Sequence, residues 1–142
     1  MDNYDALKLE NQLCFPLYAS AKEVVRKYKP FLDEIGLTYT QYIVMMVLWE
    51  RESITVKEIG SYLYLDSGTL TPLLKKLEKE DLIKRTRDKN DERNVIILIT
   101  KKGQELKKEA VTIPQKIGSC IPLSIEEAQT LYTLLHKLLK GL

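Results

Sequence analysis

The sequence has few histidines and cysteines, the residues that build zinc sites, and it lacks the apolar segments that enter membranes. Its single histidine, His136, has no cysteine or carboxylate partner at the spacing of a zinc ligand set. No apolar run is long enough to cross a bilayer, and the opening MDNYDALKLENQ has neither a basic leader nor an apolar signal core. We therefore expect a cytoplasmic protein with no metal ion, no cofactor and no membrane contact.

Cysteine is also scarce, which excludes a disulfide-stabilised scaffold. The two cysteines, Cys14 and Cys120, lie far apart in a chain that has no export signal. Free cysteine packs in proteins as a small hydrophobic residue, but an accessible thiol can also be reactive. From the residues alone, both interpretations stay open for each cysteine.

An excess of positive charge is missing as well. The 22 basic and 20 acidic residues leave a net charge of +2, which is too small to indicate nucleic-acid binding by itself. Basic residues would have to gather on one surface. The length of 142 residues fits a single domain over residues 1–142 that can bury a hydrophobic core.

A stretch rich in small and hydroxyl-bearing residues opens the amphipathic helix predicted over residues 66–80, DSGTLTPLLKKLEKE. Its apolar face consists of Leu70, Leu73, Leu74 and Leu77. Asp66 or Ser67 can cap its first turn. Such a start suits close approach to a phosphate backbone or to base edges in a DNA groove, although an ordinary solvated helix has the same pattern.

The residues around this helix predict a winged helix-turn-helix. Thr55 and Glu58 form a capping box that opens a short preceding helix, and two short helices joined by a tight turn have helix-turn-helix geometry. Two runs of strand-forming residues around the charged loop DKNDER predict a hairpin, the wing, over residues 84–100. We assign residues 38–100 to this DNA-binding region, with residues 66–80 as the reader helix.

Helical segments precede the winged region. Apolar residues follow helical spacing over residues 6–29, where Pro16 predicts a kink or a late start and Pro30 should stop the helix. A short helix over residues 31–35 should follow and end at Gly36.

A capping box of Thr38 and Gln41 then predicts a helix over residues 39–50. Its expected buried side consists of Ile43, Met46, Val47 and Trp49.

Two more helices follow the wing. Thr100 should cap a helix over residues 101–116, which Pro114 bends or ends, and Ser124 with Glu127 forms the capping box of a last helix. That last helix carries more apolar residues than packing against one neighbour requires, so we expect a partner chain. The predicted fold is mainly α with a small β wing, and residues 6–36 and 101–142 form helical dimerisation segments around the winged region.

Several stretches resemble the MarR family of winged-helix regulators, and most closely its organic hydroperoxide resistance regulators (OhrR). They are KLENQLCF with the following Tyr18, KYKPFLDEIGLTYTQY, LYLDSGTLTPLLKKLEKEDLI, DERNV and ITKKG, from about Lys8 to Gly103. DSGTLTPLLKKLE is typical of the peroxide-sensing branch, whereas DER marks the broader family. The resemblance implies a transcriptional regulator rather than an enzyme, which represses as a homodimer on a pseudo-palindromic operator of double-stranded DNA.

The resemblance also implies a redox role for the cysteines. Cys14 matches the sensor cysteine, and Tyr28 and Tyr39 match tyrosines that hold its thiolate, for which phenolic donors are suited. Attack on an organic hydroperoxide gives a sulfenic acid, which a second thiol can convert to a disulfide. Cys120 resembles the resolving cysteine of two-cysteine members, whose disulfide joins Cys14 of one chain to Cys120 of the other. Pro16 departs from the family pattern, which leaves the local helix geometry open.

Residues of the reader helix and the wing are expected to contact DNA. They are Ser67, Thr69, Thr71, Pro72 and Lys75 in the major groove, Arg93 in the minor groove, and Arg85 and Arg87 near phosphates. Oxidation of Cys14 would move the winged domains out of register and release the DNA. By resemblance, the controlled gene encodes a peroxide-reducing enzyme.

Two alternatives remain at this point. A regulator of the same fold could respond to a phenolic or other small ligand, with Cys14 buried as a structural residue. A two-cysteine thiol peroxidase would use Cys14 for attack and Cys120 for resolution, but the chain lacks the alternating strands and helices of that fold and has no arginine and threonine near Cys14 to stabilise the departing oxygen.

Overall fold

Hydroxyl and carboxylate side chains that accept hydrogen bonds from free amides begin most of the helices in the computed structural model, which describes residues 3–142. Thr38 and Ser124 each take part in a capping box, and Thr55 and Thr100 each cap the next helix, so these predicted starts are confirmed. The capping box predicted for Thr55 and Glu58 is only half formed, because the Glu58 side chain accepts from the Thr55 hydroxyl instead of from the Thr55 amide. In chain order, the elements are η1 (Asp5–Leu7), η2 (Leu9–Asn11), α1 (Cys14–Asp33), α2 (Tyr39–Arg51), β1 (Ser53–Thr55), α3 (Val56–Leu63), α4 (Ser67–Lys79), β2 (Ile83–Arg87), β3 (Val95–Ile99), α5 (Lys101–Ala110), α6 (Ile113–Gly118) and α7 (Ile125–Gly141).

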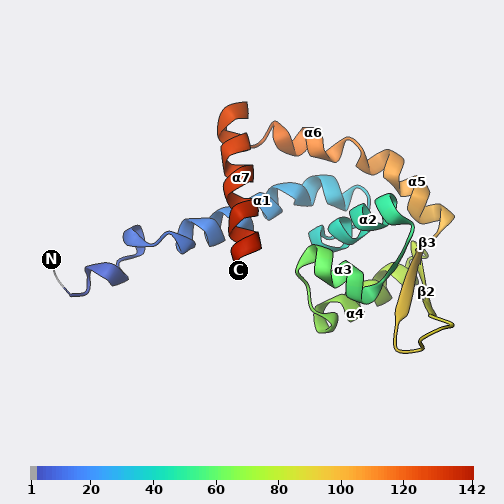
Figure 1. Ribbon diagram of the computed structural model, residues 1–142. Coiled ribbons are helices and arrows are strands. Elements are labelled where there is room, and N and C mark those ends of the chain that lie inside the picture. Colours follow the sequence, from blue (N-terminus) through green and yellow to red (C-terminus); the bar gives the residue numbers. More distant parts are fainter. Residues whose placement is uncertain (1–2) are drawn as a thin grey trace.

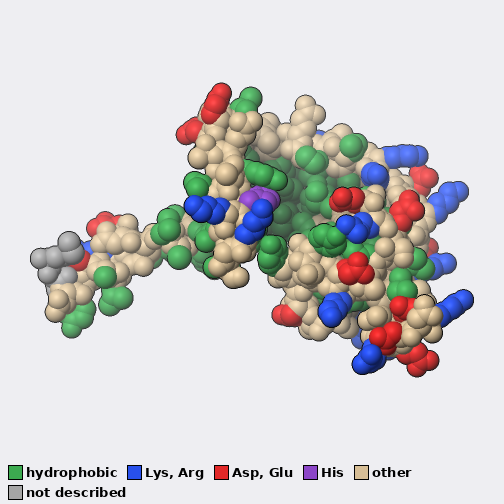
Figure 2. Space-filling model, in the orientation of Figure 1, with side chains coloured by type: hydrophobic (Ala, Val, Ile, Leu, Met, Phe, Trp, Pro, Cys, Tyr) green, Lys and Arg blue, Asp and Glu red, His purple; other side chains and the backbone are tan. Residues whose placement is uncertain are grey.

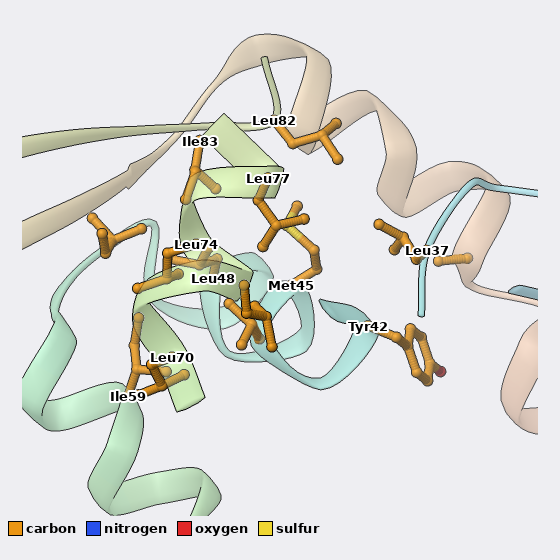
Figure 3. Close-up of a cluster of buried hydrophobic side chains, with 14 of the residues drawn as sticks. Leu37, Tyr42, Met45, Leu48, Ile59, Leu70, Leu74, Leu77, Leu82 and Ile83 are labelled. Atoms are coloured by element: carbon orange, nitrogen blue, oxygen red, sulfur yellow. The ribbon is translucent and has the colours of Figure 1, made fainter. Parts of the chain in front are cut away.

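The apolar face of α4 lies at the centre of the hydrophobic core. All four predicted residues of this face are buried, namely Leu70, Leu73, Leu74 and Leu77. Figure 3 shows Leu70, Leu74 and Leu77 beside Leu48 of α2 and Ile59 of α3. Full burial of a leucine side chain stabilises a fold by about 2 kcal/mol, so this contact fixes which side of α4 faces outward.

The wing is part of a three-stranded antiparallel sheet with the order β1-β3-β2. Strands β2 and β3 form the predicted hairpin, in which Arg85 lies opposite Ile97. Strand β1 was not predicted, because its three residues are extended only through their pairing with β3, where Ser53 lies opposite Leu98. The sheet joins the wing to the core through Ile54 and Ile97, which are both buried.

The start of α1 confirms the effect expected of Pro16. The helix begins at Cys14, and the residues before it form the short 3₁₀ helices η1 and η2 instead of an α-helix. Pro16 therefore lies in the first turn of α1, where its missing amide removes no intrahelical hydrogen bond.

The end of α1 contradicts two expectations. Pro30 lies inside the helix and does not stop it, and residues 31–33 continue α1 instead of starting a separate helix over residues 31–35. Pro30 removes one backbone hydrogen bond, but burial of Leu32 favours the continued helix. The chain then turns at Gly36, which has a φ of 70°, and the amide of Leu37 donates to the carbonyl of Leu32 at 3.1 Å.

The buried side of α2 is also different from the prediction. The most buried residues of this helix are Gln41, Tyr42, Val44, Met45 and Leu48. Met46 is 45% exposed, while Ile43, Val47 and Trp49 are only partly buried. Helix α2 is surrounded by α1, α3, α4, α5 and the sheet, so no single apolar stripe distinguishes its inner side.

After the wing, Thr100 begins α5, and the chain breaks before Pro114, which lies in the first turn of α6. Figure 1 shows α5 and α6 leading away from the wing to α7, which crosses the line of α1. Helix α7 has no buried residue in this single chain. Although α7 is rich in leucine, no helix within residues 3–142 combines the length and apolar character of a membrane span.

The N-terminal segment and the first part of α1 project from the winged body as an arm (Figures 1 and 2). Apolar side chains are exposed along this arm and along α7. The large ones include Leu13, Phe15, Leu17, Tyr18, Val24 and Val25 in the arm, and Ile125, Leu131, Tyr132, Leu134, Leu138 and Leu139 in α7. Figure 2 shows apolar surface on the arm and around the hollow between α7 and the winged body.

We predict that Gly103→Ala destabilises the protein. A Cβ atom at Gly103 would overlap the carbonyl oxygen of Leu82 and would lie 2.7 Å from a side-chain carbon of Ile99, so the base of the wing would have to move. Overpacking of this kind costs about 1–3 kcal/mol. Urea unfolding measures the loss, and Gly118→Ala is the control because a Cβ atom there would meet nothing within 4 Å. Equal unfolding midpoints for the two variants would contradict the prediction.

Candidate nucleic-acid interface and thiol site

The N-terminus of α4 is exposed and held by a charged cap. The Asp66 carboxylate accepts a hydrogen bond from the Thr69 amide at 2.7 Å. Hydrogen bonds from the amide and side chain of Thr69 lower the pKa of Asp66, so its carboxylate stays charged at neutral pH. Gly60 makes the tight turn before α4 possible, since a Cβ atom there would lie 2.6 Å from the carbonyl oxygen of Leu65.

An open groove of about 870 Å³ lies between α3, α4 and the wing. Six of the eight residues expected to contact DNA line it, namely Ser67, Thr71, Lys75, Arg85, Arg87 and Arg93. The other two, Thr69 and Pro72, are exposed on α4 but do not line the groove. The fold thus gathers basic and hydroxyl-bearing side chains on one surface, although the net charge of the chain is small.

The groove contains polar residues that the sequence interpretation did not include. Lys57 and Ser61 of α3 and Asn94 at the base of the wing loop line it. Lys57 is the second residue of α3. The sequence could have indicated it, because a lysine at this position faces away from the apolar stripe of a short helix. Asn94 carried no comparable signal.

The wing loop holds Arg93 in an exposed position. Its guanidinium forms a two-point ion pair with Asp91, with nitrogen–oxygen distances of 3.1 and 3.3 Å, and its side chain is 90% exposed. These hydrogen bonds lower the pKa of Asp91. Arg87 donates to the carbonyl of Glu92 at 2.8 Å, which ties β2 to the same loop.

Arg85 differs from the other basic residues of the groove, because its guanidinium is bound to the reader helix. It donates to one carboxylate oxygen of Glu78 from two nitrogens, at 3.1 and 2.9 Å. The amide of Arg85 donates to the other carboxylate oxygen at 3.3 Å. Hydrogen bonds from Arg85 lower the pKa of Glu78.

Two hydroxyl-bearing residues of α4 face the groove one turn apart. The Thr71 hydroxyl donates to the carbonyl of Ser67 at 2.8 Å, so its hydrogen is already bonded within the helix and its oxygen is left to accept a hydrogen bond. Pro72 has no amide to offer to the carbonyl of Gly68. The exposed side of the first α4 turns therefore presents acceptors and apolar carbon atoms.

Cys14 and Cys120 are both free and exposed. Cys14 is the first residue of α1, in the arm. Cys120 follows α6, and its thiol donates to the carbonyl of Lys116 at 3.4 Å. Helix α6 packs on α1, with the Lys116 ammonium 5.6 Å from the centre of the Phe31 ring. Cys120, which follows α6, therefore lies near the C-terminal part of α1.

The two tyrosines expected to hold the Cys14 thiolate lie together, but far from Cys14 of the same chain. The rings of Tyr28 and Tyr39 are 4.9 Å apart in an edge-on contact, and Tyr42 is 5.8 Å from Tyr28. Burial raises the pKa of Tyr28 and Tyr39, so both phenols stay protonated and can donate hydrogen bonds. Cys14 and Tyr28 are fourteen residues apart on one helix, which corresponds to about 21 Å along its axis.

Three further aromatic side chains, Tyr18, Tyr132 and His136, lie on the surface. Tyr18 is exposed, with the Lys22 ammonium 5.9 Å from its ring centre. Tyr132 and His136 stack on α7 with ring centres 4.0 Å apart. Within residues 3–142, no three histidine, cysteine, aspartate or glutamate side chains are placed to hold a metal ion.

Comparison with known proteins shows that the chain is similar to transcriptional regulators. The family model of the SarA/Rot transcriptional regulators matches residues 26–110. The organic hydroperoxide resistance transcriptional regulator of Bacillus subtilis is 50% identical to the chain, over all of this chain and 97% of that protein. SarZ of Staphylococcus aureus, a helix-turn-helix transcriptional regulator, is 47% identical over 84% of this chain and 81% of SarZ.

Solved structures of AbfR from Staphylococcus epidermidis have the same fold. Reduced AbfR bound to DNA matches with a TM-score of 0.79 and 36% identity, over 96% of this chain and 95% of AbfR. Disulfide-formed AbfR matches with a TM-score of 0.68 and 38% identity, over 96% of this chain and 93% of AbfR.

We predict that the Asp66 cap makes stability depend on pH. Because the folded state lowers the pKa of Asp66, its stabilising contribution is complete above the unfolded pKa and is lost as the pH falls through the folded pKa. Asp66→Asn keeps a capping acceptor that does not titrate. The urea unfolding midpoint should therefore decrease more between pH 7 and pH 3 for the natural chain than for Asp66→Asn. An equal decrease in both proteins would exclude the charged cap as the cause.

Proposed function

Because the chain belongs to the MarR/SarA family of winged-helix DNA-binding transcriptional regulators, on the branch of the organic hydroperoxide resistance regulators, we propose that it is a dimeric repressor controlled by oxidation of Cys14. The fold and the relatives are those of regulators, not enzymes. One observation carries the redox part of the proposal. Both thiols are exposed in the single chain and neither belongs to its hydrophobic core, whereas a structural cysteine would pack there. We place this action in the cytoplasm, where the operator DNA lies.

The groove between α3, α4 and the wing supports the DNA-binding part. A reader helix in the major groove would bring Ser67, Thr71 and Lys75 to base edges and phosphates. Thr69 and Pro72, exposed on the same helix, would contact the neighbouring bases. The narrow minor groove concentrates negative potential, which suits an exposed guanidinium such as that of Arg93.

The exposed apolar surfaces of the arm and α7 support a homodimer. Monomeric proteins rarely expose contiguous apolar patches of this kind, and most homodimers are two-fold symmetric. Residues 6–36 and 101–142 would form the dimer contact. Two reader helices related by the two-fold axis would meet successive turns of a pseudo-palindromic operator.

Two-fold symmetry also gives Cys14 a route to the tyrosines. Within one chain, about 21 Å of helix separates Cys14 from Tyr28. In a symmetric contact, Cys14 of each chain can meet Tyr28 of the other if the two α1 helices cross in opposite directions near Ala21, which lies midway between them. The short stretch Ala19, Ser20 and Ala21 has side chains small enough for a close crossing.

The same arrangement would bring the thiol of one chain toward Cys120 of the other. Helix α6 lies on the C-terminal part of α1, so Cys120 is close to the end of α1 that carries Tyr28. A resolving thiol at this position would meet the sulfenic acid of the partner subunit. The disulfide would then join two chains, not two parts of one chain.

The proposed reaction needs only an organic hydroperoxide and the two thiols. The Cys14 thiolate attacks one oxygen of an organic hydroperoxide, the O–O bond breaks, and the leaving alkoxide takes up a proton to become an alcohol. The cysteine becomes a sulfenic acid. The Cys120 thiol then displaces its hydroxyl group, which forms the disulfide and releases water. Loss of the thiolate removes the acceptor for Tyr28 and Tyr39, so the arm shifts and the reader helices lose their spacing.

The test is a gel-shift titration with a palindromic operator from upstream of a peroxide-reductase gene. We predict that reduced protein binds, that one equivalent of organic hydroperoxide releases it, and that non-reducing electrophoresis then shows a cross-linked dimer. Cys14→Ser should bind the operator but resist release, because no thiolate is present to react. Cys120→Ser is the matched control, and it should be released without a cross-link.

Each result separates the alternatives. If Cys14→Ser is still released by peroxide, Cys14 is not the sensor. If the natural chain binds but does not respond to peroxide, the protein is gated by a small ligand instead.

A second prediction concerns the wing. Arg93→Ala should weaken operator binding by about tenfold, because a minor-groove arginine contributes both charge and hydrogen bonds. Thermal unfolding should be unchanged, since the Arg93 side chain is 90% exposed. Fluorescence anisotropy measures the affinity, and an unaltered value would exclude Arg93 from the interface.

A further inference from the structure

The ion pair between Glu78 and Arg85 crosses from the reader helix to the wing. Glu78 lies in the last turn of α4, and Arg85 is the third residue of β2. Their carboxylate and guanidinium meet at 2.9 and 3.1 Å, and the Arg85 amide adds a third hydrogen bond at 3.3 Å. The Arg85 side chain is 29% exposed and the Glu78 side chain is 37% exposed, so water screens this pair less than an ion pair on the open surface.

Two of the five guanidinium N–H groups of Arg85 therefore donate to Glu78 before any DNA arrives. Arg93 is also paired, with Asp91 of the wing loop, but its side chain is 90% exposed, and Lys75 is exposed on α4. A phosphate contact by Arg85 would have to use its remaining N–H groups beside the Glu78 carboxylate, and that carboxylate would repel the phosphate. The position near phosphates expected from the sequence thus conflicts with the geometry around Arg85.

We propose that Glu78 and Arg85 act as a brace that sets the angle between the reader helix and the wing, and that Arg85 positions the wing instead of contacting a phosphate. The inference rests on the proposed DNA-binding function and adds a positioning pair to it. Hydrogen bonds from Arg85 lower the pKa of Glu78, so its carboxylate stays charged at more acidic pH than an ordinary glutamate would.

The position of the brace explains why a small tilt of the hairpin would displace the wing loop. Arg85 pairs with the fully buried Ile97, which anchors this part of the hairpin, while the loop beyond Arg87 has no such anchor. The loop starts three residues past Arg85, or about 10 Å along an extended strand. A tilt of about 10° at the brace would move the loop by about 2 Å, which is enough to break a hydrogen bond from Arg93.

The test combines three variants with a salt titration. We expect Glu78→Gln and Arg85→Gln each to weaken operator binding about fivefold, the effect of a partly exposed two-point ion pair, and the double variant to lose no more than either one. The slope of log affinity against log salt should stay at its natural value in all three. Circular dichroism and thermal unfolding confirm that each variant is folded.

A phosphate contact would give different results. Arg85→Gln would then reduce the magnitude of the salt slope by about 0.9, the value for one lost contact on duplex DNA. Glu78→Gln would bind as tightly as the natural chain or more tightly, because a repelling carboxylate is gone. Either result would overturn the brace.

The matched control is Glu105→Gln, which also removes one negative charge from an exposed ion pair, with Lys108 at 3.1 Å on α5. It should bind like the natural chain. If it weakens binding as much as Glu78→Gln does, net charge explains the effect and the brace is excluded.

Amide hydrogen exchange of the free protein tests the brace without DNA. Glu78→Gln should speed up exchange at Arg85, whose amide donates to the Glu78 carboxylate, and in the adjoining residues of β2. Unchanged exchange would overturn the brace even if the operator is bound. If the natural chain binds no operator, the proposed function fails, while faster exchange in Glu78→Gln would still support the brace.

Discussion

Burial of the leucine face of α4 is the contact on which the rest of the structure depends. Leu70, Leu74 and Leu77 are almost fully inaccessible between α2 and α3, so the opposite side of the helix has to face outward. That side carries Ser67, Thr71 and Lys75, and the lack of a side chain at Gly60 of α3 allows the close approach of the Leu65 carbonyl, which places α3 beside it. Hydrophobic packing thus orients the polar surface of the groove, although no polar residue of the groove contributes to the core.

The local features of this fold could be predicted from the sequence. Caps such as Thr38, Asp66 and Ser124 act within a few residues, so their signals are complete in a short stretch. The spacing of the α4 leucines gave its inner face for the same reason. Contacts between distant segments were not accessible in this way, because β1 is extended only through pairing with β3, and α1 continues past Pro30 where Leu32 is buried.

The candidate site shows the same difference between local signals and contacts of distant segments. The residue types on the reader helix were evident from the sequence, whereas the ion pair of Arg85 with Glu78 appears only once the wing folds back onto α4. Lys57 and Asn94 join the groove through the same folding. The resemblance identified Cys14, Tyr28 and Tyr39. Helix α1 separates the thiol from Tyr28 within one chain, whereas the ring contact between Tyr28 and Tyr39 joins two different helices and carried no local signal.

The exposed surface of α7 has a consequence for how the protein would be used in a cell. A helix with no buried residue in the single chain gains its apolar contacts only when a second chain arrives. Assembly and stability are then one equilibrium, and the amount of assembled protein rises with the square of the chain concentration while single chains predominate. Gene control by such a protein would respond steeply to its own expression level, and small changes in synthesis or degradation would be amplified at the operator.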